Sequence, residues 1–253
     1  MKINKIKKLS SGKYKILFEN KEKIITYDDV IIKNKILYNQ NINSNTYQEI
    51  NNDTVYYDIY NKTLNYISRK MRSKKEIMKF LEKFNLEENE KETIMKNLID
   101  NGFINDIQFV KAFIADKLHL SNNGPHKIKE ELLNHDIDES IIDEEFKNVN
   151  QEDIVNKLKK MIVKKANLNH KYSDYIFKQK LLYELVNLGY DKNIIISILD
   201  NQSFNNNNII KSEYDKIYSK LSKKYQGNEL IYKIKEKLYQ KGFDIESINE
   251  ILK

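Results

Sequence analysis

The chain contains one proline and six glycines among its 253 residues. β-Sandwiches and β-barrels need many tight turns, and glycine and proline are prominent among the residues that form them. Helix bundles and helical repeats need far fewer. Long stretches of this chain also carry apolar residues at the three- and four-residue spacing of one helix face. The sequence therefore predicts a mainly α-helical protein.

The first 53 residues have a different pattern and are predicted to form a small β-rich module. Three short runs look like strands, two of them joined by a polar turn near Asn20 and Lys21. The expected strands are 3–9, 13–20 and 21–27. A short helix is expected within 27–37, and the polar stretch 39–53 is expected to be a loop that leads into a helix.

Four similar junctions after residue 53 indicate an internal repeat, with their first residues 51, 53 and 53 positions apart. In each, a turn-capable residue is expected to end a helix with positive φ, and an acid two positions later is expected to cap the next helix. The junctions are Asn85-Leu86-Glu87, Asp136-Ile137-Asp138, Gly189-Tyr190-Asp191 and Gly242-Phe243-Asp244.

Two amphipathic helices precede each junction and a third follows it, which predicts three-helix repeats. The helices expected before the junctions are 54–71 with 73–84, 105–120 with 125–135, 151–167 with 175–188, and 207–225 with 229–241. The predicted divisions are the N-terminal module 1–53 and the repeats 54–104, 105–150, 151–201 and 207–253. Tandem units of this kind stack side by side, so the expected fold is an elongated, curved solenoid. The run NQSFNNNN (201–208) is expected to be a flexible linker.

The Gly124-Pro125 pair is predicted to mark the start of one such helix. Proline fits the first helical turn because its missing N–H would be unpaired there and its φ is already set. Pro125 is the only proline in the chain, and its role is expected to be structural.

Several kinds of chemistry are absent from the sequence. The chain has no cysteine, so it forms no disulfide, thiolate nucleophile or Cys-based metal site. It has no glycine-rich phosphate loop. The consecutive acids Asp143, Glu144 and Glu145 point about 100° apart on a helix and do not converge. The four histidines, which show no zinc-type spacing, are His119, His126, His135 and His170. We expect no enzyme activity, no metal and no cofactor.

The ends and hydropathy of the chain predict its location. The basic N-terminus has no apolar core of the kind found in signal peptides. No apolar run approaches the roughly 20 residues that cross a bilayer. We therefore expect a cytoplasmic protein that does not bind membranes.

The chain carries 44 basic and 37 acidic residues, a formal net charge of +7. This balance suits contact with nucleic acid or with an acidic partner, and it equally suits an ordinary lysine-rich surface. Lysines gather on the second helix of several units and on 151–167. If equivalent helices stack, these lysines could form a stripe along a phosphate backbone, or along a partner bound to DNA. Helices of mixed charge without such a stripe are the alternative.

Three strings, in this order and spacing, resemble motifs of the RecX family. MRSKKEIMKFL (71–81) matches an Arg-Ser-x-x-Glu-Leu element, NGFINDIQFVKAFI (101–114) a Gly-Tyr-Ile-Asp-Asp-x-x-Phe-Ala element, and GPHKIKEELLNHDID (124–138) a Gly-x-x-x-Ile-x-x-Glu-Leu-x-x-Lys-Gly-Ile element. The matching residues are Arg72, Ser73, Glu76, Ile77, Gly102, Phe103, Asp106, Phe109, Gly124, Ile128, Glu131, Leu132 and Ile137. The departures are Asn105 for Asp, Val110 for Ala, His135 for a basic residue and Asp136 for Gly.

This resemblance implies a non-catalytic regulator of the RecA recombinase, of the longer type found in Gram-positive bacteria. It implies binding in the groove of the RecA–DNA filament across neighbouring protomers. It also implies altered filament growth, ATP hydrolysis and strand exchange, and so modulation of recombinational repair and the SOS response. We expect a monomer that binds this filament, and direct binding to DNA stays open as an alternative.

Charge alone, rather than the family motifs, selects the candidate contacts to the filament or its DNA. They are Arg69, Arg72, Lys74, Lys75, Lys127 and Lys129. A general protein for single-stranded DNA is the second hypothesis, because tyrosines adjoin lysines at Lys171-Tyr172 and Tyr232-Lys233 and aromatic rings can stack on bases. A scaffold for an unrelated protein partner is the third.

Overall fold

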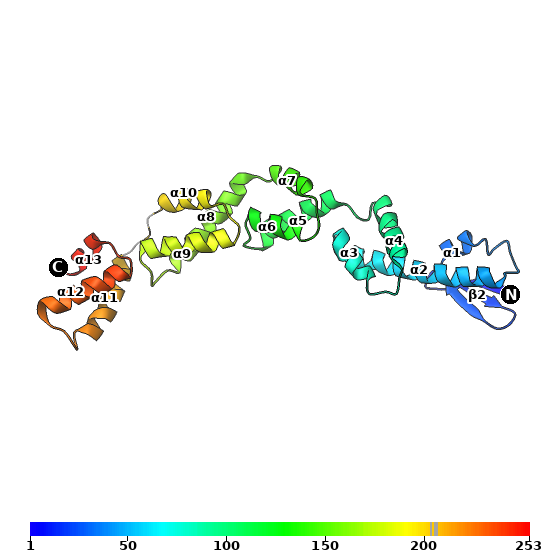
Figure 1. Ribbon diagram of the computed structural model, residues 1–253, viewed down its shortest axis with the longest axis horizontal. Coiled ribbons are helices and arrows are strands. Elements are labelled where there is room, and N and C mark those ends of the chain that lie inside the picture. Colours follow the sequence, from blue (N-terminus) through cyan, green and yellow to red (C-terminus); the bar gives the residue numbers. More distant parts are fainter. Residues whose placement is uncertain (203, 205–206) are drawn as a thin grey trace. The chain divides into compact units, whose positions relative to one another are not determined.

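A computed structural model describes residues 1–202, 204 and 207–253 (Figure 1). In these residues the chain forms three strands and thirteen helices, which confirms the mainly α class with a small β-rich module at the N-terminus. Two compact units, 1–109 and 110–253, are described in turn. The predicted linker at 201–208 includes residues 203, 205 and 206, which lie outside the described residues.

The N-terminal module is an antiparallel sheet with one short helix. Its strands pair in the order β1-β2-β3, and α1 follows directly. Alternate residues of the strands face the core, where Ile16, Phe18 and Ile24 are buried. The elements are β1 (Ile3–Lys8), β2 (Tyr14–Phe18), β3 (Lys23–Thr26) and α1 (Asp28–Lys33). The three expected strands and the short helix are confirmed.

The predicted loop at 39–53 was wrong from residue 44 onward, because α2 (Ser44–Ser68) begins there. Asn43 caps this helix, and its side-chain oxygen accepts a hydrogen bond from the Thr46 N–H at 2.7 Å. Ile50 is fully buried in the core of the sheet module. The polar sequence has no clear apolar stripe, so tertiary packing decides that it is helical. The predicted boundary at residue 53 lies within this helix.

The rest of the first unit packs two helices against α2. They are α3 (Lys74–Leu81) and α4 (Glu88–Asp100). Ser73 and Glu76 form the predicted capping box at the start of α3, with the Ser73 oxygen 3.2 Å from the Glu76 nitrogen. The fully buried members of this core are Ile77, Leu81, Ile94 and Leu98.

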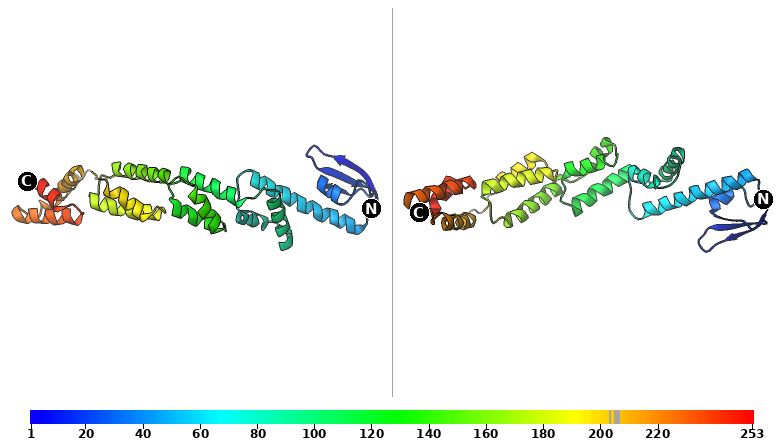
Figure 2. Two further views of the ribbon diagram at one scale, coloured as in Figure 1. Left: turned by 90° about the horizontal axis from the view of Figure 1, so that it is seen from above. Right: turned by 60° about the horizontal axis from the view of Figure 1, so that its bottom comes forward.

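Helices account for all regular structure described in the second unit. α5 starts just before the division between the units, and three groups of helices follow one another to the C-terminus. Figures 1 and 2 show α8, α9 and α10 side by side. The helices are α5 (Asp106–Leu120), α6 (Pro125–Leu133), α7 (Glu139–Lys147), α8 (Gln151–Asn167), α9 (Asp174–Asn187), α10 (Lys192–Asp200), α11 (Asn207–Leu221), α12 (Gly227–Gln240) and α13 (Ile245–Ile251). Pro125 is the first residue of α6, as expected. The division into four repeats stays a prediction.

The junctions behave as predicted in three of four cases. Asp136, Gly189 and Gly242 have φ of 57°, 86° and 80°. Asn85 does not adopt positive φ. There the Leu86 N–H donates to the Phe84 carbonyl at 2.9 Å, which closes a three-residue turn that needs no left-handed residue. The acids stand at the N-caps of the helices that follow: Glu87, Asp138, Asp191 and Asp244.

In the second unit, carbonyls at or beside two of the left-handed glycines accept hydrogen bonds from the start of another helix. The Gly124 and His126 N–H groups donate to the Leu188 and Gly189 carbonyls at 2.6 and 3.0 Å. In the same way, the Ser173 hydroxyl donates to the Lys241 carbonyl, beside Gly242, at 3.0 Å. The N-terminus of α6 therefore rests on the end of α9, and the N-terminus of α9 rests on the end of α12.

Candidate protein and nucleic-acid interface

Arg72 is held by its own neighbours in the first unit. Its guanidinium lies 4.2 Å from the centroid of the Tyr66 ring and 2.9 Å from the Glu76 carboxylate. Tyr66 in turn stacks on Phe80, with ring centroids 4.3 Å apart and planes within 4°. Only 20% of the Arg72 side chain is exposed. Arg72 thus ties the end of α2 to the start of α3, and little of it is available to a partner.

Lys74 and Lys75 lie on the first turn of α3. The Lys74 ammonium is 2.6 Å from the Asp106 carboxylate, at the start of α5, and about half of the Lys74 side chain is exposed. Lys75 is exposed. Both lie between Ser73 and Glu76, the two members of the capping box, so that box fixes their backbone positions.

Arg69 follows α2 as its C-cap and is exposed. Its side chain makes no hydrogen bond or ion pair with any residue that the structure describes. Of the six candidate cations, Arg69 is therefore the one that a phosphate or carboxylate reaches without breaking an existing pair.

Lys127 and Lys129 lie on α6, and both are paired. The Lys127 ammonium donates a hydrogen bond to the Glu130 carboxylate at 2.8 Å, and this bond raises the pKa of Lys127. Lys129 reaches two carboxylates of α7, Asp143 and Glu139, each at 2.8 Å, and these hydrogen bonds raise its pKa. Lys129 therefore holds α6 to α7, and a partner must compete with two acids for it.

The six candidate basic residues lie in two separate regions of the chain. Arg69, Arg72, Lys74 and Lys75 lie around the turn between α2 and α3, and Lys127 and Lys129 lie on α6. The turn brings four cations together within seven positions of the chain, as the sequence itself indicates.

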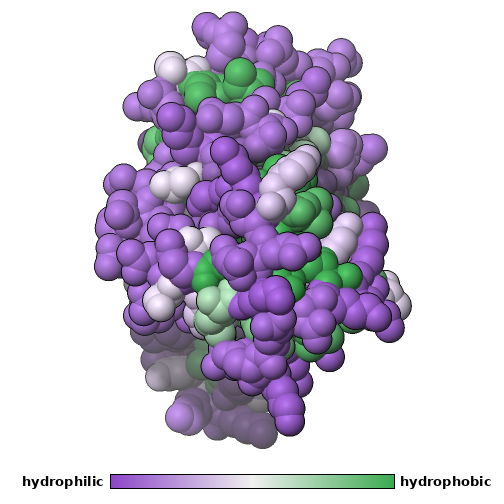
Figure 3. All heavy atoms as spheres, turned by 90° about the vertical axis from the view of Figure 1, so that its right-hand side faces the viewer, coloured by the Kyte–Doolittle hydropathy of each residue, from purple (hydrophilic) through white to green (hydrophobic). Residues whose placement is uncertain are grey.

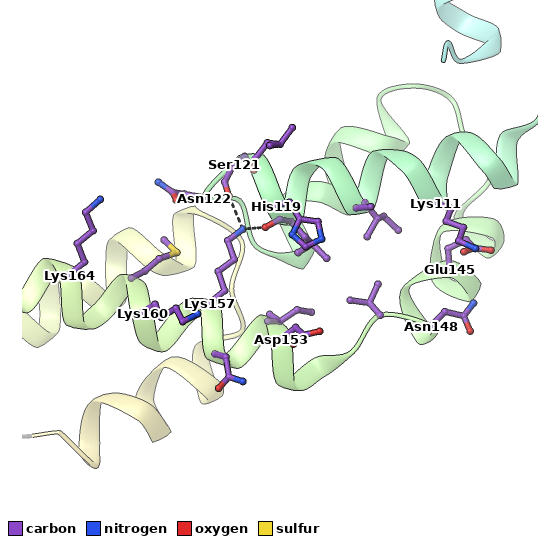
Figure 4. A pocket seen from close by; sticks show the side chains of 18 residues that line it. Lys111, His119, Ser121, Asn122, Glu145, Asn148, Asp153, Lys157, Lys160 and Lys164 are labelled. Carbon is purple, nitrogen blue, oxygen red and sulfur yellow. Dashed lines mark hydrogen bonds between the residues drawn. The ribbon is translucent and has the colours of Figure 1, made fainter. Parts of the chain in front are cut away.

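Sequence reasoning missed a hollow between α5 and α8, which has a volume of about 750 Å³ (Figure 4). Residues at helical spacing on both helices line it. The lysines of α8 stand out in the sequence, but their juxtaposition with α5 is a tertiary fact. The cationic side chains around it are Lys111, Lys157, Lys160 and Lys164.

Of these four lysines, Lys157 forms hydrogen bonds within the described part of the chain. Its ammonium donates hydrogen bonds to the Leu118 and Ser121 carbonyls, at 2.5 and 2.7 Å, and Figure 4 shows it reaching across to them. These carbonyls lie at the end of α5, where helix carbonyls lack partners of their own. Burial lowers the pKa of Lys157. Lys157 thus fixes α8 to the C-terminus of α5.

Two tyrosines on α12 are exposed. Tyr232 and Tyr239 are each 64% exposed. Lys235 lies three positions after Tyr232, and Tyr239 lies seven positions after it, so all three share one face of the helix. Tyr172, in the other pair noted from the sequence, is instead partly buried against the core of α8–α10.

Neither a metal cluster nor a membrane-spanning helix is found among the residues that the structure describes. Among residues 1–202, 204 and 207–253, no three histidines or acids lie close enough together to hold a metal ion. None of the described helices combines the length and the apolar character needed to cross a membrane. Figure 3 shows one face on which hydrophilic residues predominate and small hydrophobic areas lie between them.

Known proteins resemble the chain along its whole length, although no family model matches it. Regulatory protein RecX of Streptococcus agalactiae serotype III (strain NEM316) is 30% identical over 258 residues, which cover 100% of this chain and 99% of that protein. Regulatory protein RecX of Oceanobacillus iheyensis is 27% identical over 198 residues, covering 76% and 73%.

Two solved structures share the fold. A crystal structure of regulatory protein RecX has a TM-score of 0.70 and 23% identity, and the match covers 79% of this chain and 98% of that one. The crystal structure of RecX from Lactobacillus salivarius has a TM-score of 0.54 and 27% identity, covering 57% and 94%.

Proposed function

The chain belongs to the RecX family of regulatory proteins, and from that premise we propose that it regulates the RecA recombinase by binding the RecA–DNA filament. In this proposal it acts in the cytoplasm as a monomer, without catalysis of its own and without a cofactor. Binding in the filament groove changes filament growth, ATP hydrolysis and strand exchange, and through them recombinational repair and the SOS response.

The observation that carries the proposal is the end-to-end match to a curated regulatory protein RecX, 30% identical over 100% of this chain. Two of the four residues that depart from the family motifs keep the physical roles expected at their positions. Asn105 caps α5, with its side-chain oxygen 3.0 Å from the Gln108 nitrogen. Asp136 holds the left-handed φ of 57° at which glycine is usual. These substitutions therefore leave the local structure of the motifs intact.

The proposed contacts are the six basic residues, ranked by the availability of their side chains. Arg69 comes first because it is exposed and unpaired within the described residues. Lys74, Lys75, Lys127 and Lys129 follow, since at least three of these four already have an acidic partner. Arg72 comes last because its guanidinium is stacked and paired.

The test is the ATPase rate of RecA on single-stranded DNA while the protein is titrated in. A change in rate that saturates at stoichiometric or lower amounts supports the proposal. An unchanged rate at a stoichiometric amount contradicts it. The sign of the change, inhibition or stimulation, is an outcome of the same titration.

Direct binding of single-stranded DNA is the second candidate function, and the exposed face of α12 favours it. Tyr232, Lys235 and Tyr239 combine two solvent-facing rings with a cation, which is the combination that stacks bases and neutralises phosphates. The discriminating measurement is salt-dependent binding to bare DNA without RecA. Weak binding there beside strong binding to the filament would reject this second candidate.

A further inference from the structure

The hollow between α5 and α8 is a groove that α5, α8 and the end of α7 line, with Glu145 and Asn148 from the α7 end (Figure 4). On α8 the lining residues run from Asp153 to Lys164, eleven positions that span about 16 Å at the rise of an α-helix. The volume of about 750 Å³ lies within the usual range of ligand sites. The groove therefore has room for about three turns of a helix laid along it.

The floor of the groove is aliphatic. The apolar residues that line it include Ile114, Leu118, Val149 and Met161, and no phenylalanine, tyrosine or tryptophan is among them. Aliphatic side chains, and methionine in particular, accommodate the aliphatic side chains of a partner helix. Single-stranded nucleic acid is held instead by aromatic rings on which its bases stack.

The rim of the groove carries cations that the fold does not use. Lys111, Lys160 and Lys164 form no side-chain hydrogen bond or ion pair with any residue in the described part of the chain. Lys157 is committed to the end of α5. Two carboxylates, Glu145 and Asp153, also line the groove and repel any anion placed beside them, so they disfavour a continuous run of phosphates more than separate acids that face the lysines.

We propose that this groove binds an acidic, amphipathic helical segment of the protein partner. Its aliphatic side chains would pack on the floor, and its carboxylates would pair with Lys111, Lys160 and Lys164 on the rim. The inference rests on the proposed function, because the RecA filament is the partner whose segment is expected to occupy the groove. It adds a protein-binding site that is separate from the six basic residues assigned by charge.

The test uses the full chain and two groove variants with different chemistry. Ala115→Trp fills the groove from an exposed position of α5 and leaves every charge in place. The triple variant K111E/K160E/K164E reverses the rim. The matched control is K159E/K223E/K224E, which makes the same change of charge at exposed lysines that do not line the groove. Circular dichroism and thermal unfolding establish that all variants are folded.

Affinity is measured for RecA filaments on single-stranded DNA and, separately, for bare single-stranded DNA. We expect Ala115→Trp and the rim variant each to weaken filament binding at least about tenfold, with the control within about twofold of the parent. Because a general electrostatic attraction is insensitive to a neutral tryptophan, the loss in Ala115→Trp distinguishes a shaped site from net charge.

Three results would overturn the inference. If the parent affects RecA but Ala115→Trp binds the filament equally well, the groove is not the docking site, while the proposed function stands. If both groove variants lose bare-DNA binding to the same extent as filament binding, the occupant is nucleic acid. If the parent neither binds the filament nor changes its ATPase rate, both the proposed function and this inference are wrong.

Discussion

Gly189 meets two separate demands, a left-handed backbone and the close approach of another segment. Its φ is 86°, and a Cβ placed on it would lie 2.6 Å from the Cβ of Lys127 and closer still to the Lys127 nitrogen. Gly227 also has positive φ, at 56°, but a Cβ there meets nothing within 4 Å. Substitutions at the two glycines therefore distinguish the cost of backbone strain alone, at Gly227, from the cost of strain plus steric overlap, at Gly189.

We expect Gly189→Ala to lower the free energy of unfolding by about 3 kcal/mol, and Gly227→Ala by about 1 kcal/mol. The larger loss arises because the alanine methyl group separates the start of α6 from the end of α9 and lengthens their hydrogen bonds. Urea unfolding of both variants measures the difference. Equal losses would show that strain alone accounts for the glycine.

Arg69 and Arg72, three positions apart, are predicted to differ in what their removal does. Arg72→Ala removes the stack on Tyr66 and the pair with Glu76, so we expect a loss of about 1 to 2 kcal/mol in stability. Arg69→Ala removes an exposed, unpaired cation, so we expect stability to change by less than about 0.5 kcal/mol and filament affinity to fall. Thermal unfolding and filament titration of each variant check this, and a destabilised Arg69→Ala would contradict it.

At this scale the sequence predicted the helix caps well but did not show which basic side chains pair within the fold. Ser73 with Glu76, Pro125 at the start of α6 and the left-handed Gly189 all follow from local rules on helix ends. The pairing of Arg72 with Tyr66 depends on where two helices meet. A basic residue therefore looks the same in the sequence whether it binds a partner or its own fold.

Helix α2 is the element that joins the sheet module to the helices of the first unit. Its Asp58 accepts hydrogen bonds from Lys62, Lys13 and Tyr27, which together hold the pKa of Asp58 well below its usual value. The Lys13 and Tyr27 contacts, at 2.9 and 2.7 Å, come from the β-rich module. This carboxylate thus fastens the sheet to the helix.

Because the folded protein lowers the pKa of Asp58, the stability that this group adds is present above its unfolded pKa near 3.8 and is lost as pH falls below it. We expect Asp58→Asn to cost about 1 kcal/mol at pH near 7, since the group is about one third exposed, and progressively less as pH is lowered below about 4. Unfolding at several pH values measures this. Glu49→Gln, at an exposed position of the same helix, is the control and is expected to show no such trend.

Across the whole molecule, the net charge of +7 predicts binding to a nucleoprotein filament that weakens with salt. Raising salt from about 50 to about 200 mM is expected to lower the affinity, and Arg69→Gln is expected to reduce the slope by about one counterion. Titrations at several salt concentrations give the slope. Salt-independent binding would show that apolar contacts dominate, and an unchanged slope in Arg69→Gln would remove this residue from the phosphate contacts.

The sequence by itself determined the helical class, the β-rich start, most of the helix ends and the family resemblance that the full-length match supports. These depend on local rules, because caps, turns and apolar spacing act within a few residues. Only the tertiary structure decided that the polar stretch from Ser44 is helical, that Lys157 closes the end of α5, and that α5 and α8 leave a cationic groove between them. Each of these needs partners distant in the chain, and no local pattern encodes which segments meet.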